Sequence, residues 1–321
     1  MTTYAKRLQK VTAVLCTTAL LAGCAAGTSD NTEPAATAAQ VKTITIEPTA
    51  VYQTMNGFGA SACWWSQEVG NWENAKDILS LLYDENSGIG LNIYRYNLGA
   101  GSKDDATITD PDRRAEAFID KDGSYHWERD AAAQNALALA KSMNEDLRVT
   151  LFSNSAPVFY TANGKAYCDY LPDDEKYVTN LEPGRYADFA KYSIACAKHF
   201  TEAGYRVTGL SPINEPEWSW RGYEDGTAKQ EGCYYSKTQC RDLYKVFLKQ
   251  MAQEDALKDC RLEGWESGHI GTDTCMAYLK TMFGKSGVNW LKNTPFARVC
   301  PRWHSIPTGP ARRRSRPLPT P

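Results

Sequence analysis

The stretch Tyr205-Arg206-Val207-Thr208-Gly209-Leu210-Ser211-Pro212-Ile213-Asn214-Glu215-Pro216-Glu217-Trp218-Ser219-Trp220 decides the fold. Its first six residues form a short apolar run, which predicts a buried strand. Pro216 cannot extend a strand ladder, and it biases Glu215 towards an extended conformation. An Asn-Glu-Pro triplet at the point where a parallel strand turns into a loop therefore places one carboxyl group at the mouth of a barrel.

Strand-like runs alternate with helical segments on both sides of this stretch. The expected strands span residues 53–61, 91–98, 148–154, 205–213 and 261–265, and the expected helices span residues 72–83, 130–143, 186–203, 236–255 and 272–283. Repeated strand–helix units indicate a parallel sheet with helical crossovers. These units fit an α/β fold. The specific architecture that we expect is an incomplete (β/α)8 TIM barrel, in which strands one to about six are present. A doubly wound open sheet is the alternative, but Gly57-Phe58-Gly59 lacks the third glycine of a dinucleotide-binding fingerprint.

Residues 1–24 have the pattern of an export signal. Three basic residues precede an apolar run, residues 11–21, that is too short to span a bilayer. The run ends in Leu21-Ala22-Gly23-Cys24, which resembles the lipobox of bacterial lipoproteins, so that cleavage leaves Cys24 lipidated. An ordinary secretory signal, cut one or two residues later, is the alternative. With residues 25–40 as a flexible tether, the sequence predicts an exported lipoprotein of the bacterial cell envelope, anchored at the outer membrane or cell surface.

The amino-acid composition limits the kinds of partner and site that we expect. The chain is 42% hydrophobic and 23% charged, as expected for a globular protein, and its net charge of −2 gives no reason to expect a nucleic-acid partner. Its ten cysteines form no CxxC pair or Cys/His cluster with zinc spacing, so we expect no metal site. Some cysteines could pair in an oxidising envelope, Cys233 and Cys240 being nearest in sequence, whereas Cys196 on an apolar helical face is expected to be a buried thiol.

The end of the chain differs in composition from the rest. Residues 301–321 contain six prolines, five arginines and no acidic residue, so neither a helix nor a strand is expected there. Either this segment is a basic disordered tail, or the reading frame of a barrel gene is lost near Trp303-His304-Ser305. We expect residues 41–300 to form the partial barrel, with the alternating segment 41–47 belonging to an otherwise missing β-sandwich.

The residues suited to chemistry and to sugar binding fall at the expected strand ends or in the loop after the fourth strand, and such barrels keep their active sites at the strand ends. These motifs are Gly57-Phe58-Gly59-Ala60-Ser61-Ala62-Cys63-Trp64-Trp65, Tyr94-Arg95-Tyr96-Asn97, Phe152-Ser153-Asn154, Asn214-Glu215-Pro216, Gln230-Glu231-Gly232 and Glu263-Gly264-Trp265-Glu266-Ser267. Together they resemble glycoside hydrolase family 30, and within it the endo-β-1,6-galactanase-like members, from about residue 41 to residue 304. The resemblance implies a retaining hydrolase of β-linked polysaccharides or oligosaccharides that uses two carboxyl groups and no cofactor.

The resemblance also implies roles for individual residues. Glu215 matches the acid/base, which protonates the leaving oxygen and then deprotonates the incoming water. Asn214 matches the residue that donates a hydrogen bond to the sugar 2-OH. Arg95 is expected at the floor of the site, where it orients a carboxylate, or else forms a structural ion pair.

Further residues are expected to bind the sugar. Trp64 and Trp65 would wall the subsite, unless one of them faces the core. Trp218 and Trp220 are candidate platforms, one of them with a packing role. Asn154 would bond a sugar hydroxyl or close a turn, and Glu266, at the end of strand five, is expected to have a binding or structural role.

The second carboxylate that the resemblance implies, a nucleophile after strand seven, has no counterpart in this sequence. The sequence therefore predicts that this chain is inactive, because a single carboxylic acid cannot perform a double displacement. A surface lipoprotein that binds carbohydrate without cleaving it is the alternative from another class. A barrel with a purely structural role is disfavoured, because polar residues converge at the strand ends.

Overall fold

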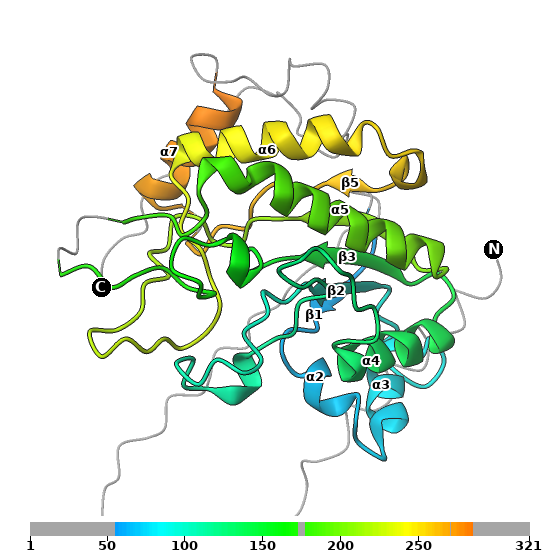
Figure 1. Ribbon diagram of the computed structural model, residues 1–321. Coiled ribbons are helices and arrows are strands. Elements are labelled where there is room, and N and C mark those ends of the chain that lie inside the picture. The colour runs from blue at the N-terminus through cyan, green and yellow to red at the C-terminus, as the bar shows by residue number, and fades with distance from the viewer. Residues whose placement is uncertain (1–54, 173–176, 270, 285–321) are drawn as a thin grey trace, which may run out of the picture. The chain divides into compact units, whose positions relative to one another are not determined.

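The computed structural model describes residues 55–172, 177–269 and 271–284 (Figure 1). The predicted signal with Cys24, the tether, the side-sheet segment 41–47 and the tail 301–321 all lie outside the described residues. So does the residue range in which a sixth strand was expected.

Five parallel strands form a single sheet in the order β1-β2-β3-β4-β5. They are β1 (Gly59–Ser61), β2 (Ile93–Asn97), β3 (Arg148–Phe152), β4 (Arg206–Ser211) and β5 (Arg261–Leu262). The strands follow one another in chain order, as in a barrel, whereas a doubly wound sheet reverses its order at a switch point. The parallel α/β architecture is confirmed, and the open doubly wound alternative is wrong for these strands.

Helices connect the consecutive strands and pack against their neighbours, α3 on α4, α5 on α6 and α6 on α7 (Figure 1). They are α2 (Ser66–Val69), α3 (Ala75–Tyr83), α4 (Ala131–Met143), α5 (Tyr186–Glu202), α6 (Lys237–Met251) and α7 (Asp273–Phe283). Short 3₁₀ turns lie at η1 (Pro111–Arg113), η2 (Val158–Tyr160), η3 (Pro183–Arg185) and η4 (Asp255–Leu257). The α6 helix begins with a capping box, in which Ser236 and Gln239 bond each other's backbone N–H.

Successive side chains of a strand point to opposite faces of the sheet, so that one face packs in the core and the other faces the site. On β2, Tyr94 and Tyr96 are buried on the helix side, where Tyr94 packs on Tyr83 and Tyr96 on Phe200, with ring centroids 5.5 and 5.0 Å apart. The intervening Arg95 points to the opposite face. That face, lined by Ser61, Arg95, Thr150 and Glu263 among others, borders a cavity of about 260 Å³.

The strands are shorter than the sequence predicts. The expected strand 261–265 contains only two residues of β5, and β1 begins only at Gly59 within the described part, residues 55–61, of the expected strand 53–61. The sequence analysis also missed α2, because this helix is a single turn directly after the tryptophan pair. The seven described cysteines are free thiols, so Cys233 and Cys240 are not paired, and Cys196 is fully buried as expected. No helix of the described residues is long and apolar enough to cross a membrane.

Candidate active site

Arg95 organises the carboxyl ends of the strands. Its guanidinium makes a two-pronged ion pair with Glu266, with Nε–Oε1 at 2.9 Å and Nη2–Oε2 at 2.5 Å. Nη2 also donates to Oδ1 of Asn214 at 3.0 Å, and Nη1 donates to Oγ of Ser61 at 3.2 Å. The guanidinium lies 3.2 Å above the centre of the Phe152 ring. One cation thus joins β1, β2 and β3 to the loops that follow β4 and β5.

The loops after β4 and β5 are also joined through their backbones. Asn214 and Glu266 form a parallel bridge, in which the Glu215 N–H donates to the Glu266 carbonyl at 2.7 Å. The Glu215 carbonyl accepts from the Trp218 N–H at 3.0 Å and from Nε1 of Trp220 at 2.9 Å. Both peptide groups that flank the Glu215 Cα are therefore fixed.

Glu215 is not extended as the sequence predicts, but has φ = +45°, in the left-handed region. A residue before proline is normally biased to extended backbone, and a non-glycine residue at positive φ costs about 1–3 kcal/mol. The three hydrogen bonds to the Glu215 backbone described above outweigh the local preference. Backbone strain that the surroundings maintain in this way is concentrated at functional sites.

The carboxyl group of Glu215 is partly buried, and its pKa is raised above the ordinary value. The largest cause is the loss of solvent, and the nearby carboxylates of Glu217 and Glu266 raise the pKa further. His269 and Arg95 act in the opposite sense. A carboxyl group that keeps its proton closer to neutral pH can serve as a general acid.

Glu217 is a third carboxylate of this cluster, and the sequence analysis gave it no role. Its Oε1 accepts hydrogen bonds from Ser267 Oγ and from the Gly268 N–H, the latter at 2.9 Å. Its Oε2 is buried without a hydrogen-bond partner in the described part of the chain. The indication was present in the sequence, because Glu217 stands two residues after Glu215 in the same motif.

The four tryptophans that the sequence predicts at the sugar subsites form two pairs along the chain. In the first pair, Trp65 packs against the core and donates from Nε1 to the Ser61 carbonyl at 2.9 Å, whereas Trp64 lies 4.9 Å from the guanidinium carbon of Arg113. In the second pair, Trp220 is held by its bond to Glu215, while Trp218 is 49% exposed and stacks on His269. One member of each pair thus has a packing role.

Arg113 is a residue of the site that sequence reasoning missed. It is paired with Asp110 at 3.1 Å, donates to Oε1 of Gln230, and lies over Trp64. Gln230 belongs to the Gln230-Glu231-Gly232 motif of the loop after β4. Arg113 therefore links this motif to the tryptophan that follows β1, across a sequence separation that no local pattern reveals.

Asn154 is buried, and its amide donates to Asn97 Oδ1 at 3.3 Å and towards Cys63 Sγ at 3.6 Å. It therefore joins three strand ends rather than closing a turn by itself. Within the described ranges, no group of three or more His, Cys, Asp and Glu side chains could hold a metal ion.

The chain is similar in sequence to two curated proteins. The chain is 31% identical over 219 residues to an endo-β-1,6-galactanase of Hypocrea rufa, covering 60% of this chain and 43% of the relative. It is 27% identical over 245 residues to an exo-β-1,6-galactobiohydrolase of Bifidobacterium longum subsp. longum, covering 58% and 16%. The chain thus spans less than half the length of these curated relatives.

The fold has a counterpart among solved structures. A conserved exported protein from Bacteroides fragilis superposes with a TM-score of 0.65 and 26% sequence identity, over 75% of this chain and 51% of that protein. The model of O-glycosyl hydrolase family 30 matches residues 41–270, which include all five strands and the whole Arg95–Glu215–Glu266 cluster. Because that match extends over well more than half of the sequence, this chain belongs to O-glycosyl hydrolase family 30.

Proposed function

We propose that this chain carries the acid/base half of a retaining β-glycosidase site for β-1,6-linked galactan, with Glu215 as the acid/base. The observation that carries the proposal is the partly buried Glu215 carboxyl group, with its raised pKa, beside Arg95 and Glu266 at the end of β4. The names of the two curated relatives, a β-1,6-galactanase and a β-1,6-galactobiohydrolase, support the choice of glycan.

The contacts of Asn214 support a complementary role in the proposed mechanism. Arg95 Nη2 donates a hydrogen bond to Oδ1 of Asn214. This bond fixes the orientation of the amide and leaves its N–H groups free to donate to substrate. A donor aimed at the sugar 2-OH stabilises the oxocarbenium-like transition state. Protonated Glu215 would donate to the leaving oxygen, and its carboxylate would then accept a proton from the attacking water.

The nucleophile that the resemblance implies after strand seven has no counterpart in the sequence, and its absence stays a prediction. Among the described carboxylates, Glu266 is the ion-pair partner of Arg95, which suits it to position that cation rather than to attack a sugar carbon. This pairing favours the second candidate function, carbohydrate binding without cleavage, for the described part of the molecule taken alone. Lipidation at Cys24 stays a prediction, and the exported relative from Bacteroides fragilis supports a location outside the cytoplasm.

Two measurements on the 321-residue chain test the proposal. Calorimetric titration should detect binding of β-1,6-galactobiose, with β-1,4-galactobiose as the control for linkage. Trp64→Ala should weaken the binding of β-1,6-galactobiose about 10-fold, whereas Trp72→Ala, at an exposed tryptophan between α2 and α3, should not. Equal affinity for the two linkages would contradict the assigned substrate.

Hydrolysis of β-1,6-galactan by the same chain separates the two candidate functions. Binding without product release would support carbohydrate binding alone and the predicted lack of a nucleophile. Release of galacto-oligosaccharides that disappears in Glu215→Gln would support catalysis and contradict that prediction. Release that persists in Glu215→Gln would contradict the role of Glu215.

A further inference from the structure

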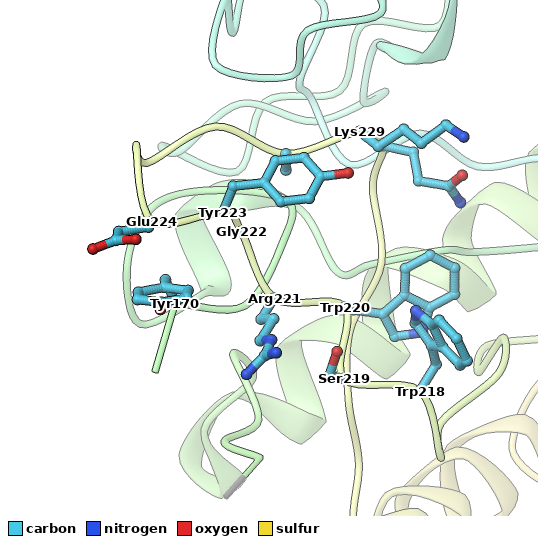
Figure 2. Close-up of a pocket in the computed structure, with 11 residues that line it drawn as sticks. Tyr170, Trp218, Ser219, Trp220, Arg221, Gly222, Tyr223, Glu224 and Lys229 are labelled. Atoms are coloured by element: carbon cyan, nitrogen blue, oxygen red, sulfur yellow. The ribbon is translucent and has the colours of Figure 1, made fainter. Parts of the chain in front are cut away.

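A cavity of about 520 Å³ lies beside the loop that follows Glu215 (Figure 2). Ten of its eleven lining residues belong to the segment 218–230, which we call the 218–230 loop, and Tyr170 comes from the segment after β3. Its size is typical of sites that bind small molecules. Figure 2 shows Trp218 and Trp220 at one end of the cavity, Tyr170 and Glu224 at the other, and Tyr223 between them.

The 218–230 loop is held in place by backbone contacts with the segment after β3. Cys168 donates to the Trp220 carbonyl at 2.9 Å and accepts from the Gly222 N–H at 2.8 Å. A Cβ atom at Gly222 would lie 2.9 Å from the Tyr167 ring, so glycine permits this close approach. The cavity is therefore preformed, which lowers the entropy that a ligand loses on binding.

Three large aromatic side chains remain exposed around this cavity. Tyr170 is 38%, Trp218 49% and Tyr223 54% exposed. A gathering of exposed apolar rings is typical of a binding surface. The polar side chains of Lys229, Gln230 and Glu224 also line the cavity. Flat apolar faces with hydrogen-bonding groups around them match a sugar ring, which has an apolar face and a periphery of hydroxyl groups.

Two residues that line the cavity are bonded to the backbone of the proposed acid/base. Trp218 and Trp220, which line its near end, both donate to the carbonyl oxygen of Glu215. A general acid faces the leaving group of its substrate. A cavity built from the residues that directly follow the acid is therefore placed to receive the leaving-group portion of the chain.

We propose that this cavity is an additional sugar subsite, which binds a galactosyl unit beyond the unit that contacts Glu215 on the leaving-group side. The proposal rests on the proposed function, because it takes the ligand to be a β-1,6-linked galactan. Tyr223, which lines the cavity and is 54% exposed, provides the ring on which that unit stacks. The subsite selects for longer chains and adds nothing to the binding of the shortest oligosaccharide.

Titration calorimetry with β-1,6-galacto-oligosaccharides of two to five units tests this inference on the 321-residue chain. We expect affinity to rise about 10-fold with length, and Tyr223→Ala to abolish that rise while the affinity for galactobiose stays unchanged. Tyr223→Phe should keep most of the rise, because it retains the ring. Trp72→Ala, an equally exposed aromatic residue outside the cavity, is the matched control.

The outcomes separate the subsite from the proposed function. If galactobiose binds but longer chains bind no more tightly, the subsite alone is overturned. The subsite alone is also overturned if the gain in affinity with chain length persists in Tyr223→Ala. A chain that binds none of these oligosaccharides would overturn the proposed substrate and the subsite together. Loss of galactobiose binding in Tyr223→Ala would place the ring in the primary site and overturn the subsite.

Discussion

Two glutamates of the same loop region, Glu215 and Glu231, lie in opposite environments. Glu215 is partly exposed, and it shares its surroundings with a cation, Arg95, and two further carboxylates. Glu231 is fully buried, and its oxygens accept from Ser102 Oγ at 2.6 Å and from the Ala100 N–H at 3.1 Å. The first carboxyl group is accessible to a substrate, while the second connects the residue directly after the 218–230 loop to the segment after β2.

The difference shows that a raised pKa alone does not identify an acid catalyst. Burial raises the pKa of Glu231 to about 7, and it raises that of Asp130, which accepts from the Tyr96 hydroxyl, to about 7 as well. Neither group is exposed to substrate. Perturbed carboxyl groups occur in structural networks as well as in active sites, so access must decide between them.

The largest expected effect is on catalysis. Glu215→Gln should lower any hydrolysis of β-1,6-galactan by the chain about 100- to 10,000-fold, because the amide cannot transfer a proton. The free energy of unfolding should change little, because the backbone hydrogen bonds of residue 215 are retained. Rate assays paired with urea unfolding measure both quantities. Glu145→Gln, at an exposed position after α4, is the matched control, and an equal loss of rate there would refute the assignment.

The next effect is the pH dependence of stability caused by Glu231. The folded chain holds this proton up to about pH 7, whereas the unfolded chain releases it near pH 4.5, so the folded state binds more protons between these values. The stabilisation is therefore complete below pH 4.5 and is lost as pH rises to 7. The loss amounts to about 3 kcal/mol, and Asp130 acts in the same sense.

Urea unfolding at several pH values checks this prediction. Glu231→Gln should flatten the decline in unfolding free energy between pH 4.5 and pH 7, whereas the exposed Glu145→Gln should leave it unchanged. An undiminished decline in Glu231→Gln would show that this carboxyl group is already ionised in the folded chain.

Much of the fold was predictable, because it rests on local patterns. The alternation of apolar runs and helical periods predicts all five strands and the five longer helices of the described residues. The strand ends were less accurate, because regular pairing of β5 ends at Leu262 and resumes only as the isolated bridge between Asn214 and Glu266. The single-turn helix α2 has too few residues to produce a periodic pattern.

The site was predictable where its residues follow strands directly. Asn214, Glu215, Arg95 and Glu266 do converge at one edge of the sheet, as their strand-end positions predict. Arg113 was missed, since its contact with Trp64 joins two loops whose shapes no sequence pattern specifies. The positive φ of Glu215 was missed for a similar reason, because its hydrogen bonds with Glu266 in the loop after β5 and with two tryptophans override the preference set by Pro216.

A smaller effect is expected for the cation that connects the strand ends. Arg95→Ala should lower the free energy of unfolding by about 2 kcal/mol, because it leaves Glu266 unpaired at a partly exposed position. Arg95→Lys should recover only part of this loss, because an ammonium group cannot make the two-pronged contact. Urea unfolding of the two variants measures the difference. Equal stability of the alanine variant and the parent chain would contradict the central role given to Arg95.

The smallest effect concerns the proton of Glu215 itself. The Glu217 carboxylate raises the pKa of Glu215, so Glu217→Gln should lower that pKa towards its ordinary value. Titration of ¹³C-labelled glutamate side chains by NMR can follow the change without any turnover. Glu231→Gln is the informative comparison, since it removes a buried carboxyl group that is not among the groups acting on Glu215. If both variants moved the Glu215 pKa equally, the separation between the Glu215–Glu217–Glu266 cluster and the buried Glu231 network would not hold. A shift in Glu217→Gln alone would show that the neighbouring carboxylates tune the proposed acid, while the buried network supports the loop.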